Sequence, residues 1–346
     1  MMQLKDPGRI KVFFKDPDKK NIIKIIKEVL VLWSTKNELP IYYFKYLYKS
    51  YVKNYRDYLA PGEARKIHGS GRLHKIEYTS ILNNKLNFAL YCETYGISTP
   101  VLVGHNFGGS FFSGSGIRSI SNLTELVNLY GEVFDKIDAD AIFFRPLALN
   151  GGRGCFMLNR ETYTRQLKTE YENLMLGDYT HTEAVEQHPA INAIYGKSIN
   201  TLRILTHKDK DNVDIISSFI RLGAGGSIVD NGSSGGLFVG IEQESGALKR
   251  TAYRDMKFGG GEFGVHPDTG FRFEDFEIPY FKEACELAEK AARYIPNGFI
   301  GWDIALTENG PTIIEGNEDP HLFMSDVAYG GLLKNPKMKK MISNIN

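Results

Sequence analysis

The chain has 346 residues, of which 42% are hydrophobic and 24% charged, a composition typical of globular proteins rather than fibrous or disordered ones. Its three cysteines leave one unpaired and lack metal-ligand spacing, which argues against a disulfide framework. No segment approaches the ~20 apolar residues of a membrane-spanning helix, and the N-terminus lacks the apolar stretch of a secretion signal. We therefore expect a cytoplasmic protein with reduced thiols and two or three lobes.

The small net charge of +1 hides an uneven distribution along the chain. Residues 1–80 carry 17 Lys and Arg against 8 Asp and Glu, a net charge of +9. The remaining residues carry 25 against 33, a net charge of −8. A basic end beside an acidic body indicates either an anionic partner at that end or two lobes that attract each other.

Residues 1–75 are predicted to form a helical N-terminal region. The segment "KKNIIKIIKEVLVLW" is amphipathic, and "PIYYFKYLYKSYVKNYRDYL" opens with Pro40, which suits a first helical position. On that second helix, four basic residues spaced by four, four and three would form one stripe: Lys45, Lys49, Lys53 and Arg56. The stripe is either a solvated face behind a core-facing aromatic side, or a docking surface for an anionic glycan, a lipid head group or a protein. Peripheral membrane association through these basic helices belongs to the second interpretation.

From about residue 76 the pattern changes to alternating helices and strands, which predicts a mixed α/β (α+β) body. Helices are predicted over four segments, namely 78–96, 121–137, 161–176 and 279–295, and in the second Asn122 and Glu125 are spaced like a capping box. Strands are predicted in four others, namely 97–104, 140–158 around a glycine-rich turn, 198–223 as a pair, and 299–317 as a hairpin. A glycine-rich loop lies within 225–238, and a basic helix ends the chain.

The hairpin "FIGWDIALTENGPTIIEGN" places oxygen-bearing side chains at one end of two apolar strands. A turn centred between Asn309 and Gly310 sets Asp303 level with residue 316, so Glu315 and Asn317 flank that level on one face. Asp303 joins them given a favourable register or a small bulge. Two carboxylates and an amide suit Mg²⁺, which takes further ligands from phosphates and so implies a nucleotide. The alternative is an acidic strand end in which Asp303 bonds an arginine or a backbone N–H.

Two further features bear on a phosphate ligand. The turn in "FFRPLALNGGRGCFML" can close backbone N–H groups over phosphates, although a plain hairpin with glycines is the alternative. Arg203 lies inside the apolar strand "TLRILT" and therefore needs an anionic partner, either a phosphate or an acid such as Asp214. The eight histidines show no zinc-ligand spacing, and no basic motif indicates a nucleic-acid partner.

In this order the motifs over residues 75–325 resemble the ATP-grasp superfamily, most closely its sugar-transfer-associated branch. The resemblance implies two α/β lobes that grip ATP, preceded by a helical N-terminal extension. The implied segments are a helical region 1–75, an N-terminal lobe 76–140, a small lobe with a glycine-rich lid 141–190, and a large lobe with the metal site 191–346.

The resemblance also implies roles for individual residues. ATP would be bound by Lys85, by Arg145 where most members have lysine, by a lid with Gly151, Gly152 and Gly154, and by a hinge strand with Glu183, Val185 and Glu186. Arg203 would contact the γ-phosphate, and Arg221 would act with it in catalysis. The acyl acceptor would face Asn231, Ser233, Ser234 and Gly235. Two Mg²⁺ ions would be held by Asp303, Glu315 and Asn317.

The implied activity is that of an ATP-dependent carboxylate–amine ligase that works through an acyl phosphate. Its partners would be a small-molecule or glycan-linked carboxylate, such as a uronic acid or an amino acid in polysaccharide biosynthesis, and an amine. The alternatives are an ATP-grasp kinase that phosphorylates a hydroxyl, and a degenerate nucleotide-binding module.

Overall fold

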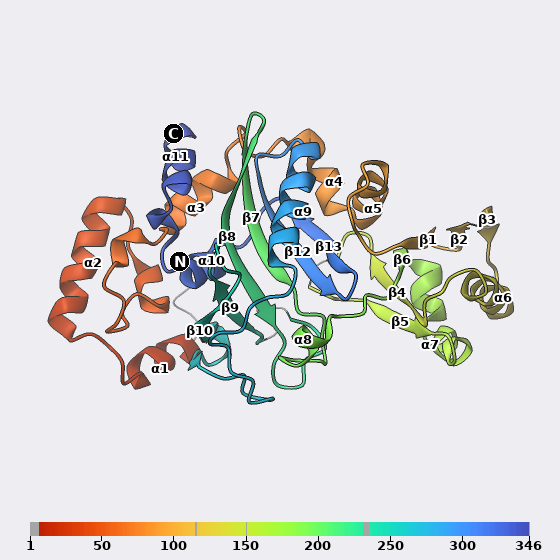
Figure 1. Cartoon of the computed structure of the whole chain (residues 1–346), viewed down its shortest axis with the longest axis horizontal. Coiled ribbons are helices and arrows are strands. Elements are labelled where there is room, and N and C mark those ends of the chain that lie inside the picture. The colour runs from red at the N-terminus through yellow and green to blue at the C-terminus, as the bar shows by residue number, and fades with distance from the viewer. Residues whose placement is uncertain (1–6, 115, 150, 231–234, 346) are drawn as a thin grey trace.

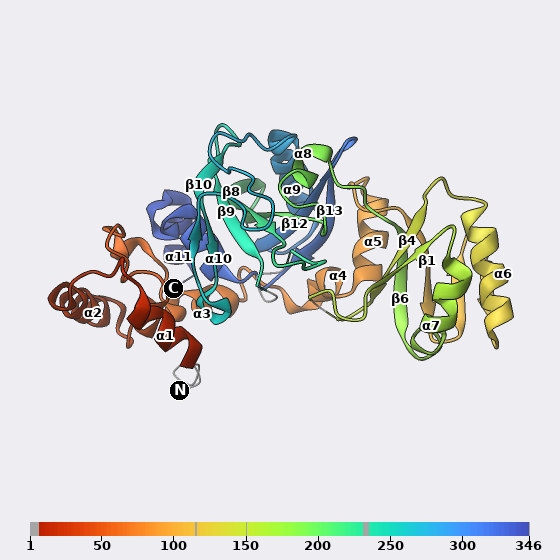
Figure 2. The ribbon, with the colours of Figure 1, turned by 90° about the horizontal axis from the view of Figure 1, so that it is seen from below.

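The computed structural model describes residues 7–114, 116–149, 151–230 and 235–345. They form three parts along the longest axis of the molecule: a helical N-terminal region, a large lobe and a small lobe (Figure 1). The same order is seen after a quarter turn (Figure 2), so the small lobe and helix α2 (Ile22–Lys36) lie at opposite ends. The mixed α/β class is confirmed. None of the helices in the described ranges combines the length and apolar character that crossing a bilayer requires.

The small lobe is built on one antiparallel sheet. Its strands are β1 (Leu102–Phe107), β2 (Ser110–Ser113), β3 (Gly116–Ser119), β4 (Ala141–Pro146), β5 (Phe156–Asn159) and β6 (Asp178–Glu183), in the order β3-β2-β1-β6-β4-β5. Because β6 pairs with both β1 and β4, the sheet takes strands from both sides of residue 140. Helices α6 (Leu123–Phe134) and α7 (Tyr163–Leu176) share one hydrophobic cluster with it. The predicted cap of α6 is confirmed, since Asn122 accepts a hydrogen bond from the Glu125 backbone N–H.

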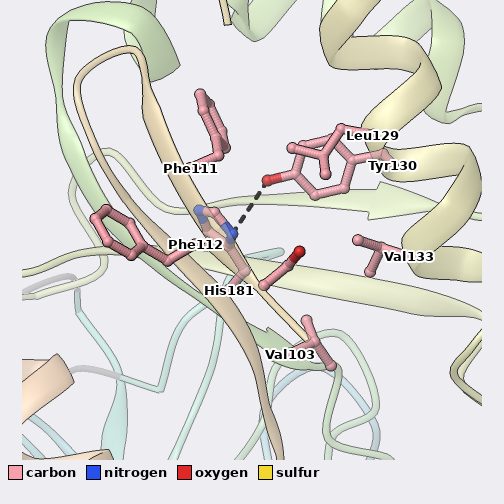
Figure 3. Close-up of a pocket in the computed structure, with 8 residues that line it drawn as sticks. Val103, Phe111, Phe112, Leu129, Tyr130, Val133 and His181 are labelled. Atoms are coloured by element: carbon pink, nitrogen blue, oxygen red, sulfur yellow. Dashed lines mark hydrogen bonds between the residues drawn. The ribbon is translucent and has the colours of Figure 1, made fainter. Parts of the chain in front are cut away.

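The core of the small lobe contains a buried histidine, His181 (Figure 3). One ring nitrogen, Nδ1, lies 3.1 Å from the Tyr130 hydroxyl, and the other, Nε2, lies 2.9 Å from Asn106 Oδ1. Burial lowers the pKa of His181 well below its usual range, so the ring is neutral. The adjacent cavity of about 10 Å³ has room for at most one water molecule. This cluster therefore supports the fold and offers no space to a substrate.

The large lobe is built on a second antiparallel sheet. Its strands are β7 (Leu202–Asp209), β8 (Asn212–Leu222), β9 (Leu237–Ile241), β10 (Leu248–Arg254), β11 (Glu262–Phe263), β12 (Phe299–Thr307) and β13 (Gly310–Asn317), in the order β11-β10-β9-β8-β7-β12-β13. Helix α9 (Phe281–Tyr294) packs on one face, in a cluster with Leu202, Ile304 and Ile313. Helix α10 (Leu322–Tyr329) and the N-terminal region pack on the other face, around Phe219 and Phe238. Along the chain, helix α8 (Pro189–Asn192) precedes the first strand of this sheet, and helix α11 (Pro336–Asn344) follows α10.

The hairpin β12–β13 turns one residue earlier than predicted. Thr307 pairs with Gly310, so the two turn residues are Glu308 and Asn309. A bulge at Ile314 then shifts the register, and Asp303 lies opposite Glu315 rather than level with residue 316. Opposed residues in a sheet point to the same face. The bulge that the sequence left open is therefore present, and it brings the two carboxylates together.

One predicted helix divides into two shorter helices. Residues 78–96 form α4 (Thr79–Asn83) and α5 (Lys85–Thr94), separated by Asn84. The Asn84 side chain accepts hydrogen bonds from the backbone N–H groups of Leu86 and Asn87, at 3.0 and 3.1 Å. Asparagine is favoured in such an N-cap because its side chain satisfies donors that lack a helical partner. Lys85 consequently becomes the first residue of a new helix.

The N-terminal region differs from its prediction in the tyrosine-rich segment. The region has α1 (Pro7–Lys15), α2 and α3 (Pro61–His68), but residues 40–58 form only short 3₁₀ turns at Ile41–Lys45 and Tyr55–Asp57. Tyr42 and Tyr43 are both buried, as are Leu47 and Tyr48. Consecutive side chains of one helix diverge by about 100° and would not all reach a core. Burying adjacent aromatics therefore favours turns over a continuous helix.

The predicted basic stripe is wrong for the same reason. The Lys49 ammonium lies 2.5 Å from Asp16 and 3.2 Å from Glu262, which makes it part of a charge cluster inside the region. The Lys45 ammonium lies 5.5 Å from the centre of the Phe323 ring, and Lys53 donates to the backbone carbonyl of Ser50. The three lysines therefore have different partners and do not form one basic surface.

Candidate functional site

A row of three ionisable side chains crosses neighbouring strands of the large sheet. Arg203 on β7 lies opposite Asp303 on β12, which lies opposite Glu315 on β13, so all three share one face. Arg203 donates from Nε to Asp303 Oδ1 at 2.5 Å and from Nη2 to Oδ2 at 3.0 Å. The sequence left open whether Arg203 pairs with Asp214. Asp214 instead pairs with Lys337 at 2.7 Å, so the partner of Arg203 is Asp303.

Arg221 joins this row from the next strand. Its Nη2 donates to Asp303 Oδ2 at 2.9 Å, and its Nε lies 3.3 Å from Asp230 Oδ2. Burial alone would raise the pKa of Asp303, but the charges of Arg203 and Arg221 outweigh it and lower that pKa to about 2. Asp303 is therefore ionised at neutral pH. The sequence offered two alternatives, and both are observed. Asp303 bonds arginines, and its carboxylate also lies close to the other oxygen-bearing side chains.

Asp230 is a member of this cluster that the sequence analysis missed. It is buried, and its Oδ2 accepts hydrogen bonds from the backbone N–H of Thr201 at 2.9 Å and from the Thr201 hydroxyl at 2.6 Å. Its only sequence signal is its position directly before the glycine-rich loop. Asp230 contacts the Arg221 guanidinium at Nε and Asp303 contacts it at Nη2, so two carboxylates hold this side chain in place.

Glu315 and Asn317 complete the cluster at the end of β13. The Asn317 amide nitrogen lies 3.5 Å from both Asp303 Oδ2 and Glu315 Oε1, so the three predicted metal ligands converge. Burial, and then the negative charge of Asp303, raise the pKa of Glu315. Among the described residues, no cationic group forms an ion pair with Glu315. A half-buried carboxylate beside a second carboxylate is stabilised by a proton or a cation, so the donor set fits a divalent metal ion.

The set is a small one by the standards of protein metal sites. Within the described ranges, no three His, Cys, Asp or Glu residues lie close enough to hold a metal ion. The cluster therefore offers two carboxylates and one amide, whose oxygen would have to turn toward the ion. Such a set leaves coordination positions for phosphate oxygens and water, as Mg²⁺ prefers.

Arg145 connects the small lobe to this cluster. Its side chain is buried, and its Nη1 donates to the backbone carbonyl of Ile314 at 2.9 Å. Ile314 is the bulged residue, so the bulge supplies a carbonyl that has no partner in the ladder. The Nε–H of Arg145 is buried without an acceptor in the described part of the chain. A buried unpaired donor is costly, which indicates that a ligand atom is missing from its surroundings.

Lys85 and the glycine-rich turn lie at the same end of the small lobe. Lys85 Nζ donates to the carbonyl of Leu149 at 2.6 Å, and positive φ angles of 74°, 73° and 71° at Gly151, Gly152 and Gly154 allow the chain to fold back. A Cβ at Gly152 would lie 3.1 Å from Val229 Cγ1, so the turn runs close against the large lobe. Asn150 lies outside the described residues.

The segment after β6 links the two lobes. Strand pairing extends to Ala184, because the N–H groups of Glu183 and Ala184 donate to Val101 and Ala141 carbonyls at 2.9 and 3.0 Å. Across the ranges that the structure covers, no backbone hydrogen bond involves Val185 or Glu186. These two residues therefore present free backbone groups between the lobes, as a hinge that pairs with an adenine edge requires.

Only one of the four residues predicted to face the acyl acceptor, Gly235, lies within the described ranges. Asn231, Ser233 and Ser234 lie outside the described residues. Gly235 is described, has a φ of +87°, and leaves 3.6 Å between a Cβ and the Phe258 ring. Arg221 is therefore the only predicted acceptor-side group that the structure places at the charge cluster.

The model of the family described as sugar-transfer associated ATP-grasp matches residues 70–341, which is more than half of the chain. No curated protein is similar in sequence at a significant level.

Solved structures with a similar fold share little sequence with the chain. The N5-carboxyaminoimidazole synthase of Aspergillus clavatus, solved with ADP, is 13% identical, with a TM-score of 0.42 over 75% of this chain and 53% of that chain. D-alanyl-alanine synthetase A of Vibrio cholerae is 12% identical, with a TM-score of 0.43 over 82% of this chain and 73% of that one. The ATP-grasp ligase PsnB, solved with Mg and ADP, is 10% identical, with a TM-score of 0.43 over 79% and 61%. The match thus spans little more than half of the first of these proteins, and the likeness concerns the fold alone.

Proposed function

Because the chain belongs to the sugar-transfer associated ATP-grasp family, we propose that it is an ATP-dependent carboxylate–amine ligase. The observation that carries the proposal is the cluster at the lobe boundary, where the half-buried Glu315, without an ion-pair partner among the described residues, adjoins an aspartate held by two arginines. A cluster of this kind binds opposite charges of one ligand: a metal ion at the carboxylates and phosphate oxygens at the arginines.

The nucleotide would lie between the two lobes. Val185 and Glu186 would pair with the adenine edge through their free backbone groups, with Glu183 beside the ribose. Lys85 and Arg145 would bind phosphate oxygens, since Lys85 can exchange its bond to Leu149 for a phosphate and Arg145 has an unpaired Nε–H. The turn with Gly151, Gly152 and Gly154 would close over the triphosphate and exclude water.

Mg²⁺, as two ions, would be held by Asp303, Glu315 and Asn317. Bound there, it would neutralise the charge that builds up on the transferring phosphoryl group. Asp303 is already ionised, whereas the raised pKa of Glu315 means that metal binding would displace a proton at the acidic end of the pH range.

The proposed reaction has two steps. A carboxylate oxygen of the substrate attacks the γ-phosphorus, the bond to the β-phosphate oxygen breaks, and an acyl phosphate and ADP form. The amine then attacks the acyl carbon, phosphate leaves, and the amine loses a proton to solvent. Arg203 and Arg221 would stabilise the oxyanion and the departing phosphate, and Asn231, Ser233, Ser234 and Gly235 would face the acyl group. A uronic acid or an amino acid is the carboxylate we propose.

The test is product identity. The full chain is incubated with Mg-ATP and panels of carboxylates and amines, and ADP, phosphate and new amide masses are measured. ADP with an amide and free phosphate supports the ligase, and ADP with a phosphoester supports the kinase alternative. Nucleotide binding without ADP formation under any pair of substrates supports the degenerate module.

We also propose that helix α2 rests on an anionic membrane surface. Its outer side exposes five large apolar residues at near-helical spacing, Ile22, Ile23, Ile26, Leu30 and Trp33. Lys24 and Lys27 lie on the same helix, within an N-terminal segment whose net charge is positive. An apolar face combined with lysines is the pattern of helices that lie in the head-group layer of anionic lipids. The helix also lies at the end of the molecule farthest from the small lobe (Figure 2).

Vesicle binding tests this surface. Trp33 is 52% exposed and Trp302 is fully buried, so a fluorescence shift on adding phosphatidylserine vesicles reports on α2. We expect Ile26→Glu to abolish the shift, and Leu176→Glu, at an exposed leucine of the small lobe, to leave it intact. Equal binding to uncharged phosphatidylcholine vesicles would contradict the role of the lysines.

A further inference from the structure

A cavity of about 300 Å³ lies between the N-terminal region and helix α10. Its volume is at the lower end of the range for small-molecule sites. The walls combine rings of Tyr42, Tyr46, Tyr58 and Phe323 with the polar groups of Lys45 and His321. None of these residues belongs to the charge cluster described above, and the family match begins at residue 70, after most of this wall.

The cavity is adjacent to the charge cluster through the chain that follows β13. After Asn317, the chain passes through Pro320 to His321 in the cavity wall. Pro320 packs beside Arg203, because a Cβ at Gly301 would lie 2.6 Å from Pro320 Cβ and 3.3 Å from Arg203 Cδ. Burial lowers the pKa of His321, and the charges of Lys45 and Arg203 lower it further, so His321 lies within the field of both.

The charges that face the cavity favour an anion. The Lys45 ammonium is partly buried and stacks on the Phe323 ring, and no carboxylate lies within ion-pair distance of it in the described part of the chain. Of the two acids in the wall, Asp319 is paired with His68 at 2.6 Å, and Asp326 accepts backbone N–H groups of Leu59 and Leu332. A half-buried ammonium without a counter-ion is the feature that an acidic ligand group would satisfy.

We propose that this cavity binds the carboxylate substrate before reaction, as a hydroxylated ring acid of the size of one sugar. Its negative charge would lie on Lys45, with a hydrogen bond from neutral His321, and the carboxylate would then move past Pro320 to Arg203 and Arg221. The aromatic rings supply the flat apolar surface that the ring of such a ligand covers, and the polar wall groups orient it. The inference rests on the proposed ligase function. The amine would bind outside this cavity, because Lys45 would repel its positive charge.

The test uses three ring compounds that differ at one group: D-glucuronate, D-glucose and D-glucosamine. Their affinity for the full chain is measured by titration calorimetry without nucleotide. We expect D-glucuronate to bind at least ~10-fold more tightly than the other two, and Lys45→Met to remove that preference, as loss of a hydrogen bond to a charged group does. Lys45→Arg should retain it, and Lys53→Met, at a lysine of the same segment outside the cavity, should have no effect.

Several outcomes would overturn the assignment. They are equal affinity of wild type and Lys45→Met for D-glucuronate, tighter binding of D-glucosamine, and the absence of binding by all three compounds. Lys45-dependent binding of D-glucuronate without any ADP formation would keep the cavity and reject the ligase. Amide formation that is unchanged by Lys45→Met would keep the ligase and reject the cavity.

Discussion

Each lobe buries a polar cluster, and the two differ in whether their groups are satisfied. In the small lobe, His181 is neutral, bonds Tyr130 and Asn106, and the Asn106 amide donates to three backbone carbonyls at 2.8–2.9 Å. At the large-lobe cluster, Glu315 has no ion-pair partner among the described residues, and Arg145, which reaches the cluster from β4 of the small lobe, has an Nε–H without an acceptor in the same ranges. Burying unsatisfied groups costs stability. Buried atoms without a partner also occur outside this cluster, at Tyr42 and Ser217 among others, so the unmet donor of Arg145 supports the proposed site only together with unpaired Glu315 and the converging side chains.

The substitution Asp303→Asn should have the largest effect on the charge cluster of the large lobe. It leaves Arg203 and Arg221 without their shared carboxylate and removes one proposed metal ligand, so we expect no product and no thermal stabilisation by Mg²⁺ with an ATP analogue. The variant should also lose ~3–5 kcal/mol of stability, as broken buried pairs do. Asp214→Asn, at an acid of the same sheet that pairs with Lys337, is the matched control. A thermal shift that is unchanged in Asp303→Asn would refute the metal assignment.

Arg221→Ala tests the catalytic half of the cluster. We expect a loss of product formation of ~10²-fold or more with nucleotide binding retained, because one oxyanion donor is removed while Lys85, Arg145 and Arg203 remain to bind phosphate oxygens. Rates are measured with saturating substrates, and binding by calorimetry with an ATP analogue. Arg221→Lys keeps the charge between Asp303 and Asp230 and should be less impaired. Wild-type rates in Arg221→Ala would mean that the acyl group lies elsewhere.

His181→Phe tests the other side of the comparison. The folded pKa of His181 lies well below 6.5, so below pH 6.5 the unfolded chain binds more protons and stability falls as the pH falls. We expect the variant to lose ~1–3 kcal/mol at pH 7, from the unpaired Tyr130 and Asn106 groups, and to show a flatter dependence between pH 4 and 6.5. Urea unfolding at several pH values measures both. Loss of Mg-nucleotide binding in this variant would remove the distinction between the clusters.

Arg145→Lys should have the smallest effect. Lysine keeps the positive charge but lacks the fork that serves both the Ile314 carbonyl and a ligand, so we expect nucleotide affinity to fall by a factor of ~3–10. Competition binding with an ATP analogue measures it. If the loss were as large as that of Asp303→Asn, the Arg145 side chain would be as important for nucleotide binding as the carboxylate of Asp303.

The sequence predicted the α/β class, the helix cap at Asn122 and the convergence at the end of the last hairpin, because these depend on local periodicity and short spacing. It placed the hairpin turn one residue too late, because it centred the turn on Asn309 and Gly310, whereas Gly310 is already the first paired residue of β13. It missed Asp230, whose role depends on Arg221 across a strand and a loop. It also predicted a helix for residues 40–58, where long-range burial of adjacent aromatics overrides helical periodicity.

The extra residue in β13 has a consequence for sequence spacing. With a two-residue turn, directly opposed residues are an odd number of positions apart, as Thr307 and Gly310 are, whereas Asp303 and Glu315 are separated by an even number. A chain shortened by Ile314 would still set the two acids face to face, in an unbroken ladder. It would lose only the carbonyl that fastens Arg145 to the large lobe. We therefore expect a single deletion to separate the proposed metal binding from the contact that joins Arg145 to the large lobe.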